Sequence, residues 1–263
     1  MIRAGSCLGP GLAGIIAGMF GLRSAFLAVS GAAGLAALLV VVFAKAGAPR
    51  PIAAPDQKPL NMLQVARANW RTLTSAGAGQ VFGQMVRAGR QTIVPLYAAD
   101  VLGLDVEFIG LVWSIAAFLE MWMFIPAGQV MDRFGRKWAI VPCFAGMGIG
   151  MALLPLTSNF WSLLAVLSFM NVSNGMGAGT MMTLGADLAP PDSRGEFLAL
   201  WRVVGDSGSA AGPLVVGGVA AALVLQPAAL VMGAIGLTSA AIFYFFVPET
   251  LKRAPAQAAS AAD

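Results

Sequence analysis

The sequence contains no histidine, only two cysteines and few charged residues. Charged side chains make up 11% of the 263 residues, whereas a soluble domain averages about 25%. So few charges cannot cover the surface of a water-soluble protein of this size. Because Cys7 and Cys143 lie in different apolar stretches and histidine is absent, we expect neither a disulfide nor a metal site. No motif sets a nucleophile beside a general base, so we expect neither an enzyme nor a cofactor.

Apolar runs are abundant. Hydrophobic residues make up 58% of the chain, and the mean hydropathy is +0.80. A helix needs about 20 apolar residues to cross a bilayer, and a spanning helix satisfies its own backbone hydrogen bonds in lipid. The alternating pattern of barrel strands is not seen. We therefore predict an all-α membrane protein with about eight transmembrane helices, at residues 4–20, 24–44, 73–98, 107–128, 138–156, 161–185, 204–225 and 228–247.

One long polar connection divides these helices into two groups. Its prolines are Pro49, Pro51, Pro55 and Pro59. Proline-rich polar segments favour loops, so we predict a cytoplasmic linker at 45–72, whose end, from Leu60 to Arg71, fits a short surface helix. The predicted organisation is therefore two helices at 1–44, the linker at 45–72, a six-helix bundle at 73–248 and a cytoplasmic tail at 249–263.

Positive charge gathers on one side of the predicted helices. That side holds most of the 16 lysines and arginines: Arg3, Lys45, Arg50, Lys58, Arg67, Arg71, Arg133, Arg136, Lys137, Arg194, Arg202, Lys252 and Arg253. The opposite side holds Arg23 and the acidic residues Asp100, Asp105 and Glu107. The positive-inside rule then places both termini in the cytoplasm. Topology accounts for the basic patches, so we expect a multi-pass protein of the cell inner membrane and no nucleic-acid partner.

A six-residue pattern occurs twice. Residues 5–10 read GSCLGP and residues 208–213 read GSAAGP, an offset of 208 − 5 = 203 residues. Small residues at every fourth position let helices approach closely, and proline bends a helix, so the shared pattern indicates duplicated halves. A repeat of this length holds six helices, but only two precede the linker. We therefore expect four helices to be missing before Met1. In-frame upstream DNA that encodes four more apolar spans would distinguish an incomplete sequence from a true remnant. Gly9 and Pro10 interrupt the first run and argue against a cleaved signal peptide.

Residues 128–137, GQVMDRFGRK, close the fourth predicted helix. They resemble the G-x-L-x-D-R-x-G-R-[RK] loop of the major facilitator superfamily of transporters. GSCLGPGLAG at 5–14 resembles part of that family's fifth-helix antiporter motif, with Ala13 in place of a glycine. DLAPPDSRGEFLALWR at 187–202 is similar to the family's loop between helices ten and eleven, and PETLKR at 248–253 to the segment after its last helix. The chain thus resembles helices five to twelve of a 6+6 drug/proton antiporter.

This resemblance implies a conformational role for two groups of residues. In the family, the GQVMDRFGRK-like loop latches helices in one conformational state, and the bent fifth and eleventh helices lie where the two halves meet. The residues so implied are Gly9, Pro10, Gly128, Asp132, Arg133, Gly135, Arg136, Gly212 and Pro213. Independently, a carboxylate such as Asp132 is expected to pair with an arginine or to accept from a helix N-terminus.

The third predicted helix carries polar side chains along one face. Gln80, Gln84, Arg87 and Gln91 follow at steps of four, three and four residues, and Arg90 lies nearly on the same face. An ionisable residue at membrane depth costs at least about 2.5–3.5 kcal/mol, so each one needs a reason. We interpret Gln84, Arg87, Arg90 and Gln91 as candidates for the substrate or proton pathway. For the arginines, a structural ion pair or a side chain that reaches the membrane surface is the alternative.

Three further polar residues lie inside predicted helices. Glu120 is a candidate proton carrier, because desolvation favours its neutral form; alternatively it is the partner of Arg87. Asn171 and Asn174 are placed to bind substrate or to hold helices together. The glycine-rich NGMGAG, 174–179, lies inside an apolar run without a preceding strand, so we expect helix packing rather than a nucleotide-binding loop.

We therefore predict secondary active transport of a small organic solute by alternating access, with proton-coupled efflux as the expected mode. The alternatives are a sugar or metabolite symporter or facilitator, a nonfunctional truncated remnant or scaffold, and, disfavoured by the lack of catalytic groups, a membrane enzyme. The expected partners are the solute, protons and the lipid bilayer, and the full-length protein is expected to be monomeric. We expect no transport by the chain alone, because half of the cavity wall would be absent.

Overall fold

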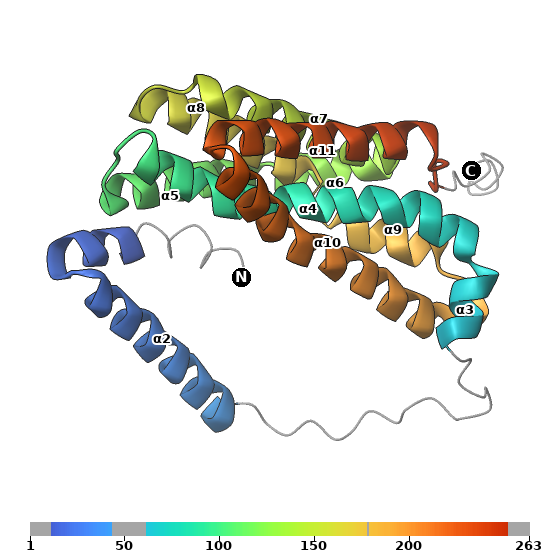
Figure 1. Ribbon diagram of the computed structural model, residues 1–263. Helices are drawn as coiled ribbons and strands as arrows, with labels where there is room; N and C mark the ends of the chain where they lie inside the picture. The colour runs from blue at the N-terminus through green and yellow to red at the C-terminus, as the bar shows by residue number, and fades with distance from the viewer. Residues whose placement is uncertain (1–11, 44–61, 178, 252–263) are drawn as a thin grey trace, which may run out of the picture.

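The computed structural model describes residues 12–43, 62–177 and 179–251. Within these ranges the chain is helical apart from short turns and connections, and no strand occurs there, so the predicted all-α class is confirmed. Most of the helices form one bundle (Figure 1). Gly9, Pro10 and the first copy of the repeated pattern lie outside the described residues, as do most of the linker and the tail.

The N-terminal part forms two helical segments. Residues 12–20 are helical, Gly21 turns the chain with φ +83°, and α2 follows over Leu22–Phe43. A Cβ added at Gly14 would lie 3.2 Å from the Gly110 Cα, so the first segment packs closely on a helix of the bundle. In contrast, α2 lies apart from the bundle beyond its first turns (Figure 1), and large apolar side chains along it are exposed. Exposed apolar surface of this extent fits a lipid or protein neighbour.

The remaining helices follow the short α3. They are α3 Met62–Ala68, α4 Trp70–Asp100, α5 Val106–Trp122, α6 Phe124–Arg133, α7 Lys137–Leu153, α8 Phe160–Met176, α9 Thr180–Leu188, α10 Arg194–Ala222 and α11 Leu225–Phe245. The short helix expected at the end of the linker is thus α3. In the bundle, α4 packs against α10 and α11, α11 packs against α7, and α5 and α7 both pack against α8.

Four segments of the described chain are long and apolar enough to cross a membrane by length and composition alone. They are Arg23–Val42, Val106–Arg133, Lys137–Leu156 and Leu225–Phe245. Each coincides with a predicted transmembrane helix. The long helices α4 and α10 do not belong to this group; α4 carries the glutamines and arginines noted above.

Two predicted continuous helices are broken in the structure. The fourth, predicted at 107–128, divides at Met123 into α5 and α6, because Pro126 has no N–H to donate to the carbonyl four residues earlier. The sixth, predicted at 161–185, divides into α8 and α9 at Gly177 and Gly179, where Gly179 takes the left-handed φ of +78°. The glycine-rich stretch therefore ends a helix, so the prediction of one continuous helix over 161–185 was wrong, whereas the expected close packing is seen at Gly175, where a Cβ would lie 2.7 Å from the carbonyl oxygen of Glu120.

Helix α10 begins earlier than predicted. It starts at Arg194 rather than at 204, so much of the segment expected to be a loop at 187–202 is helical. A short 3-10 turn, Pro191–Ser193, precedes it. Proline favours the first turn of a helix, where its missing N–H is not needed. The composition of this segment is thus typical of a helix start rather than of an extended loop.

Glycine lets α10 approach α4 closely. A Cβ at Gly208 would lie 2.2 Å from the carbonyl oxygen of Val81, and one at Gly212 would lie 2.6 Å from that of Met85. Real Cβ atoms do not come so near, so only glycine fits at these crossings. The close approach expected of the GSAAGP pattern is confirmed for its second copy, which includes Pro213 inside the helix. This packing fixes the face of α4 that carries the polar side chains.

Candidate functional site

Polar side chains from α4, α5 and α8 meet inside the bundle. They form what we call the interior network: Arg87, Arg90, Glu120, Asn171 and Asn174. Arg90 is 3% exposed, Glu120 9% and Asn171 1%, whereas Arg87 and Asn174 are half-buried. Charged groups removed from water are costly unless they are paired. The network therefore carries a free-energy cost that ordinary helix packing does not require.

Asn174 joins the two oppositely charged groups. Arg87 Nε donates to Asn174 Oδ1 at 2.8 Å, and Asn174 Nδ2 donates to Glu120 Oε1 at 2.9 Å. The amide thus accepts from the cation and donates to the carboxylate, which connects α4 to α5 through α8. The sequence left open whether Arg87 and Glu120 form a pair. In the structure they are linked through this amide.

Three further groups that the sequence did not point to contact Arg87. Its Nη2 donates to the carbonyl of Gly177 at 3.5 Å and contacts Cys143 Sγ at 3.6 Å, and the guanidinium lies 5.0 Å from the centre of the Phe144 ring. The carbonyl is available because α8 ends at Gly177. In the sequence, the glycine-rich stretch at 174–179 was the one feature that could have indicated this helix end. Broken membrane helices expose backbone groups at the binding sites of many secondary transporters.

Arg90 forms the second half of the interior network. Its Nη1 donates to Asn171 Oδ1, and its guanidinium lies 5.5 Å from the centre of the Trp113 ring on α5. An arginine over an indole face is attracted by the ring quadrupole. Trp113 was not among the site residues predicted from the sequence, because a single aromatic residue in an apolar run does not distinguish a binding site from ordinary packing. The structure thus adds it to the surroundings of Arg90.

The glutamines of the α4 face differ in position. Gln80 is buried, and its Nε2 donates to the carbonyl of Trp201 at 3.0 Å, which ties α4 to α10. Gln84 is half-buried and Gln91 is exposed. No side-chain hydrogen bond joins either of them to the interior network within the described ranges. The geometry therefore supports Arg87 and Arg90 as site residues more strongly than Gln84 and Gln91.

A second group of charged residues surrounds the turn between α6 and α7. We call it the loop network: Asp132, Arg136, Asp187 and Glu249. Arg136 Nε donates to Asp187 Oδ2 at 2.9 Å, and its Nη1 reaches the carbonyl of Met131 at 3.0 Å and Asp132 Oδ1 at 3.4 Å. Asp132 therefore pairs with an arginine as expected. The network unites the three C-terminal segments in which the sequence showed a family resemblance.

Glu249 closes this turn. Its carboxylate accepts from the backbone N–H groups of Arg136 at 2.8 Å and Lys137 at 3.0 Å, at the start of α7. It also accepts from the N–H groups of Thr250 and Leu251. Burial alone would raise the pKa of Glu249, but these four N–H donors outweigh burial and lower the pKa below its ordinary value. Gly135, with φ +116°, allows the carboxylate to approach.

The other residues implied by the motif make fewer contacts. A Cβ added at Gly128 would meet no atom within 4 Å in the described structure. Arg133 is exposed, and within residues 62–177 and 179–251 it forms no salt bridge. The observed contacts of the motif thus concentrate in Asp132, Gly135 and Arg136. The conformational roles of all these residues stay predictions.

Comparison with known proteins decides the family. Residues 76–262, which include both networks, match the family model described as the Major Facilitator Superfamily. The chain belongs to this superfamily. It is therefore a multi-pass membrane protein of a transporter family and not an enzyme, as the sequence predicted.

Relatives agree with this assignment. The chain is 31% identical over 141 residues to the multidrug resistance protein MdtG of Yersinia enterocolitica, covering 53% of this chain and 34% of that protein. It is 26% identical over 169 residues to the efflux pump azaK of Aspergillus niger, covering 59% and 35%. It is 22% identical over 121 residues to a Na(+), Li(+), K(+)/H(+) antiporter of Planococcus maritimus, covering 41% and 28%. The match thus spans about a third of each relative's length.

Proposed function

We propose that the protein carrying this chain is a secondary transporter that exchanges protons for a small organic solute by alternating access. The observation that carries this proposal is the Arg87–Asn174–Glu120 connection inside the bundle. Ionisable residues within membrane helices generally mark substrate or ion pathways. Relatives named as multidrug resistance, efflux and cation/proton antiport proteins support export and proton coupling.

Glu120 is the proton carrier in this mechanism. When ionised, its carboxylate accepts from Asn174 Nδ2, which in turn holds its oxygen toward Arg87. Protonation of Glu120 weakens this hydrogen bond, since a charged acceptor binds more strongly than a neutral one. Asn174 and Arg87 are then no longer held in the arrangement that binds solute, so protonation of Glu120 releases the solute, as exchange requires. Proton binding and solute binding are coupled because both depend on the side-chain amide of Asn174.

The broken helices and the loop network carry the conformational change. The interior network lies next to the α8–α9 break, and the loop network ties the α6–α7 turn to Asp187 and to the segment after α11. Rocking of one bundle against another around a fixed site is the general motion of such transporters. Release of the loop contacts would accompany one of the two end states. The Gly212–Pro213 segment of α10 lies where the halves would meet.

The asymmetry of lysine and arginine supports an inner-membrane orientation with both termini in the cytoplasm. This orientation places the loop network on the cytoplasmic side. Tags on the two ends, probed by membrane-impermeant reagents in intact cells, should both be protected. Labelling of either tag from outside would contradict the orientation.

Proton coupling is testable in everted membrane vesicles. The gene is expressed from its native locus, so that any adjoining in-frame sequence is retained. Vesicles are energised, and the proton gradient is followed by acridine orange on addition of ethidium, 2-naphthoate or glucose, which are a cation, an anion and a neutral sugar. We expect at least one of the two aromatic solutes to release protons in wild type and not in the Glu120→Gln variant.

The matched control is Asp206→Asn. Asp206 is a carboxylate on α10 that is exposed and paired with Arg202 on the surface of the helix. Its loss should leave proton release unchanged. Equal proton release by wild type and Glu120→Gln overturns the role of Glu120. Proton movement with glucose alone, in the symport direction, overturns export in favour of a sugar symporter.

A further inference from the structure

Three hydrogen-bond donors around Arg90 lack partners. Arg90 Nε, Asn171 Nδ2 and Trp113 Nε1 are all buried and have no hydrogen-bond partner among the described residues. Arg90 and Asn171 are bonded to each other, and the Arg90 guanidinium lies over the Trp113 ring. Buried polar groups are nearly always satisfied, and leaving one unpaired costs about 1–3 kcal/mol. All three groups can only donate, so the partner they lack is an acceptor.

The charge of the interior network points to the same kind of partner. Two guanidinium groups, on Arg87 and Arg90, stand against the single carboxylate of Glu120, so the network has one positive charge in excess when all three are ionised. Charged groups at membrane depth are normally paired. One negative charge on a bound group would balance the network. A carboxylate fits both requirements, since it is anionic and only accepts hydrogen bonds.

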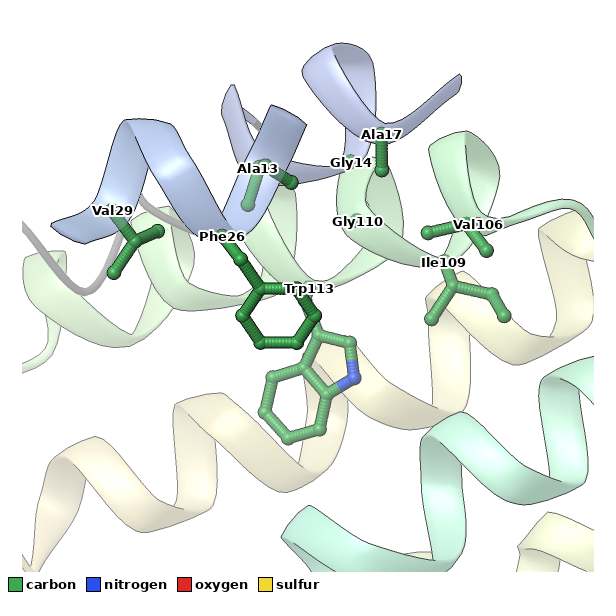
Figure 2. A pocket seen from close by; sticks show the side chains of 10 residues that line it. Ala13, Gly14, Ala17, Phe26, Val29, Val106, Ile109, Gly110 and Trp113 are labelled. Atoms are coloured by element: carbon green, nitrogen blue, oxygen red, sulfur yellow. The ribbon is translucent and has the colours of Figure 1, made fainter. Parts of the chain in front are cut away.

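An apolar chamber lies against the same tryptophan. A cavity of about 340 Å³ opens between residues 12–20, α2 and α5. Figure 2 shows the side chains around it, among them Phe26 and Val29 from α2 and Ile109 and Trp113 from α5. Of the ten described residues that line the cavity, Trp113 alone has a polar side chain. The volume suits a small organic molecule.

Trp113 therefore touches both an apolar chamber and a donor-only polar site. We propose that Arg90, Asn171 and Trp113 bind the anionic, hydrogen-bond-accepting head of an amphipathic aromatic solute, whose apolar body lies in the chamber. The inference rests on the proposed transport function and specifies its solute. The donors are covered in this conformation, so the Trp113 indole moves aside when the head group enters. A cationic solute of the same shape is repelled by the excess positive charge.

Three naphthalene compounds test this assignment. The purified chain in lipid nanodiscs is dialysed to equilibrium against 2-naphthoate, 2-methylnaphthalene or 2-naphthylmethylamine, which share the rings and differ in the head group. Uptake by empty nanodiscs is subtracted, because all three partition into lipid. We expect saturable binding of 2-naphthoate, and binding of the other two that is at least about ten-fold weaker, the difference made by one charge-assisted hydrogen-bonded contact. Equal binding of all three compounds overturns the anionic site, since it means that only their shared rings are bound, by the apolar chamber.

Variants separate the head site from the chamber. Arg90→Gln should weaken 2-naphthoate binding about 10- to 100-fold, and Trp113→Phe, which keeps an aromatic ring but removes the N–H, about five-fold. Trp122→Phe on the same helix is the control, because Trp122 is exposed and does not line the chamber. Ala17→Phe fills the chamber and should weaken binding at least about five-fold, whereas Ala28→Phe on the exposed side of α2 should not. All variants are first checked for insertion and helicity.

The two proposals fail separately. Binding is measured without a proton gradient, so loss of proton-driven transport with intact, Arg90-dependent binding of 2-naphthoate refutes only the transport proposal. Proton-coupled movement of ethidium, together with 2-naphthoate binding that Arg90→Gln and Trp113→Phe leave unchanged, refutes only the anionic site. Equal losses in Trp113→Phe and Trp122→Phe also refute it, because they show a general effect on packing.

Discussion

The interior network and the loop network are made from the same kinds of side chain but differ in how fully their hydrogen-bonding groups are satisfied. In the loop network the carboxylates of Asp132 and Asp187 surround Arg136, and Glu249 is satisfied by four backbone N–H groups. In the interior network two arginines share one carboxylate, and donors on Arg90 and Asn171 are left over. The loop network is exposed on its acidic side, whereas the interior network is removed from water.

This difference indicates different tasks. A cluster whose hydrogen-bonding groups are satisfied stabilises one arrangement of its helices and leaves no group free to bind a ligand. A cluster with unsatisfied donors in a low-dielectric surrounding is destabilising until a ligand supplies the missing acceptors. We therefore expect substitutions in the interior network to change transport more than stability, and substitutions in the loop network to do the reverse.

The largest expected effect is that of Arg87→Ala. It removes the cation that holds Asn174, the Gly177 carbonyl and the Cys143 thiol. Solute-driven proton release in everted vesicles should fall to background, while the amount of protein in the membrane stays at the wild-type level. Arg202→Ala, an exposed arginine paired only with Asp206 among the described contacts, is the control. Unchanged kinetics in Arg87→Ala would remove Arg87 from the site.

A smaller effect is expected for Gly177→Ala. The added Cβ would lie 2.4 Å from Cys143 Sγ and 3.1 Å from Arg87 Nη2, so the interior network has to shift. Crowding of this kind costs about 1–3 kcal/mol, and we expect both slower transport and a lower melting temperature in detergent. Gly128→Ala is the matched control, since its Cβ would meet only open space in the described structure. Wild-type transport by Gly177→Ala would show that the network tolerates displacement.

Gly135→Ala tests the loop network by itself. Gly135 has φ +116°, and an added Cβ would lie 2.4 Å from the Glu249 carboxylate. A non-glycine residue in such a conformation costs on the order of 1–3 kcal/mol. The melting temperature should fall, while 2-naphthoate binding to the interior site stays within about two-fold of wild type. A selective loss of binding with no loss of stability would reverse the assignment of tasks.

The smallest expected effect is the pH dependence of Glu249. Because folding lowers its pKa, the carboxylate stabilises the folded state above its ordinary pKa of 4.5 and loses this contribution as the pH falls below that value. For an exposed group the contribution is less than about 1 kcal/mol. Thermal unfolding at pH 7 and pH 4 should therefore differ less in Glu249→Gln than in wild type. Asp192→Asn, at an exposed carboxylate before α10, should behave as wild type.

Sequence reasoning found the members of the interior network because each is conspicuous in an apolar run. A charged residue such as Arg87 or Glu120 is costly at membrane depth, so it stands out as a candidate even when its partners are unknown. It could not find the neighbours, since Cys143 and Trp113 follow no pattern in their own helices and Gly177 was visible only as one member of a glycine-rich stretch. What brings them to the arginines is the rotation of α5, α7 and α8 against α4, and no local pattern encodes that rotation.

The glutamines show the same limit along a single helix. Gln80 and Gln91 are 91 − 80 = 11 residues apart, which puts them only about 20° apart around an α-helix of 3.6 residues per turn. Yet Gln80 is buried and Gln91 is exposed. The periodicity of α4 correctly gives one polar face, but α10 covers that face only along part of its length. Burial thus depends on where the neighbouring helix runs.

Asn174→Leu tests the central claim most directly, because this side chain is the link between Arg87 and Glu120. Leucine has the same branching as asparagine, without its polar atoms, and suits a membrane helix, so insertion should be preserved. Solute-driven proton release, measured at equal amounts of inserted protein, is predicted to fall to background. Proton release by Asn174→Leu at the wild-type rate would contradict the claim that these three residues act as one coupled unit.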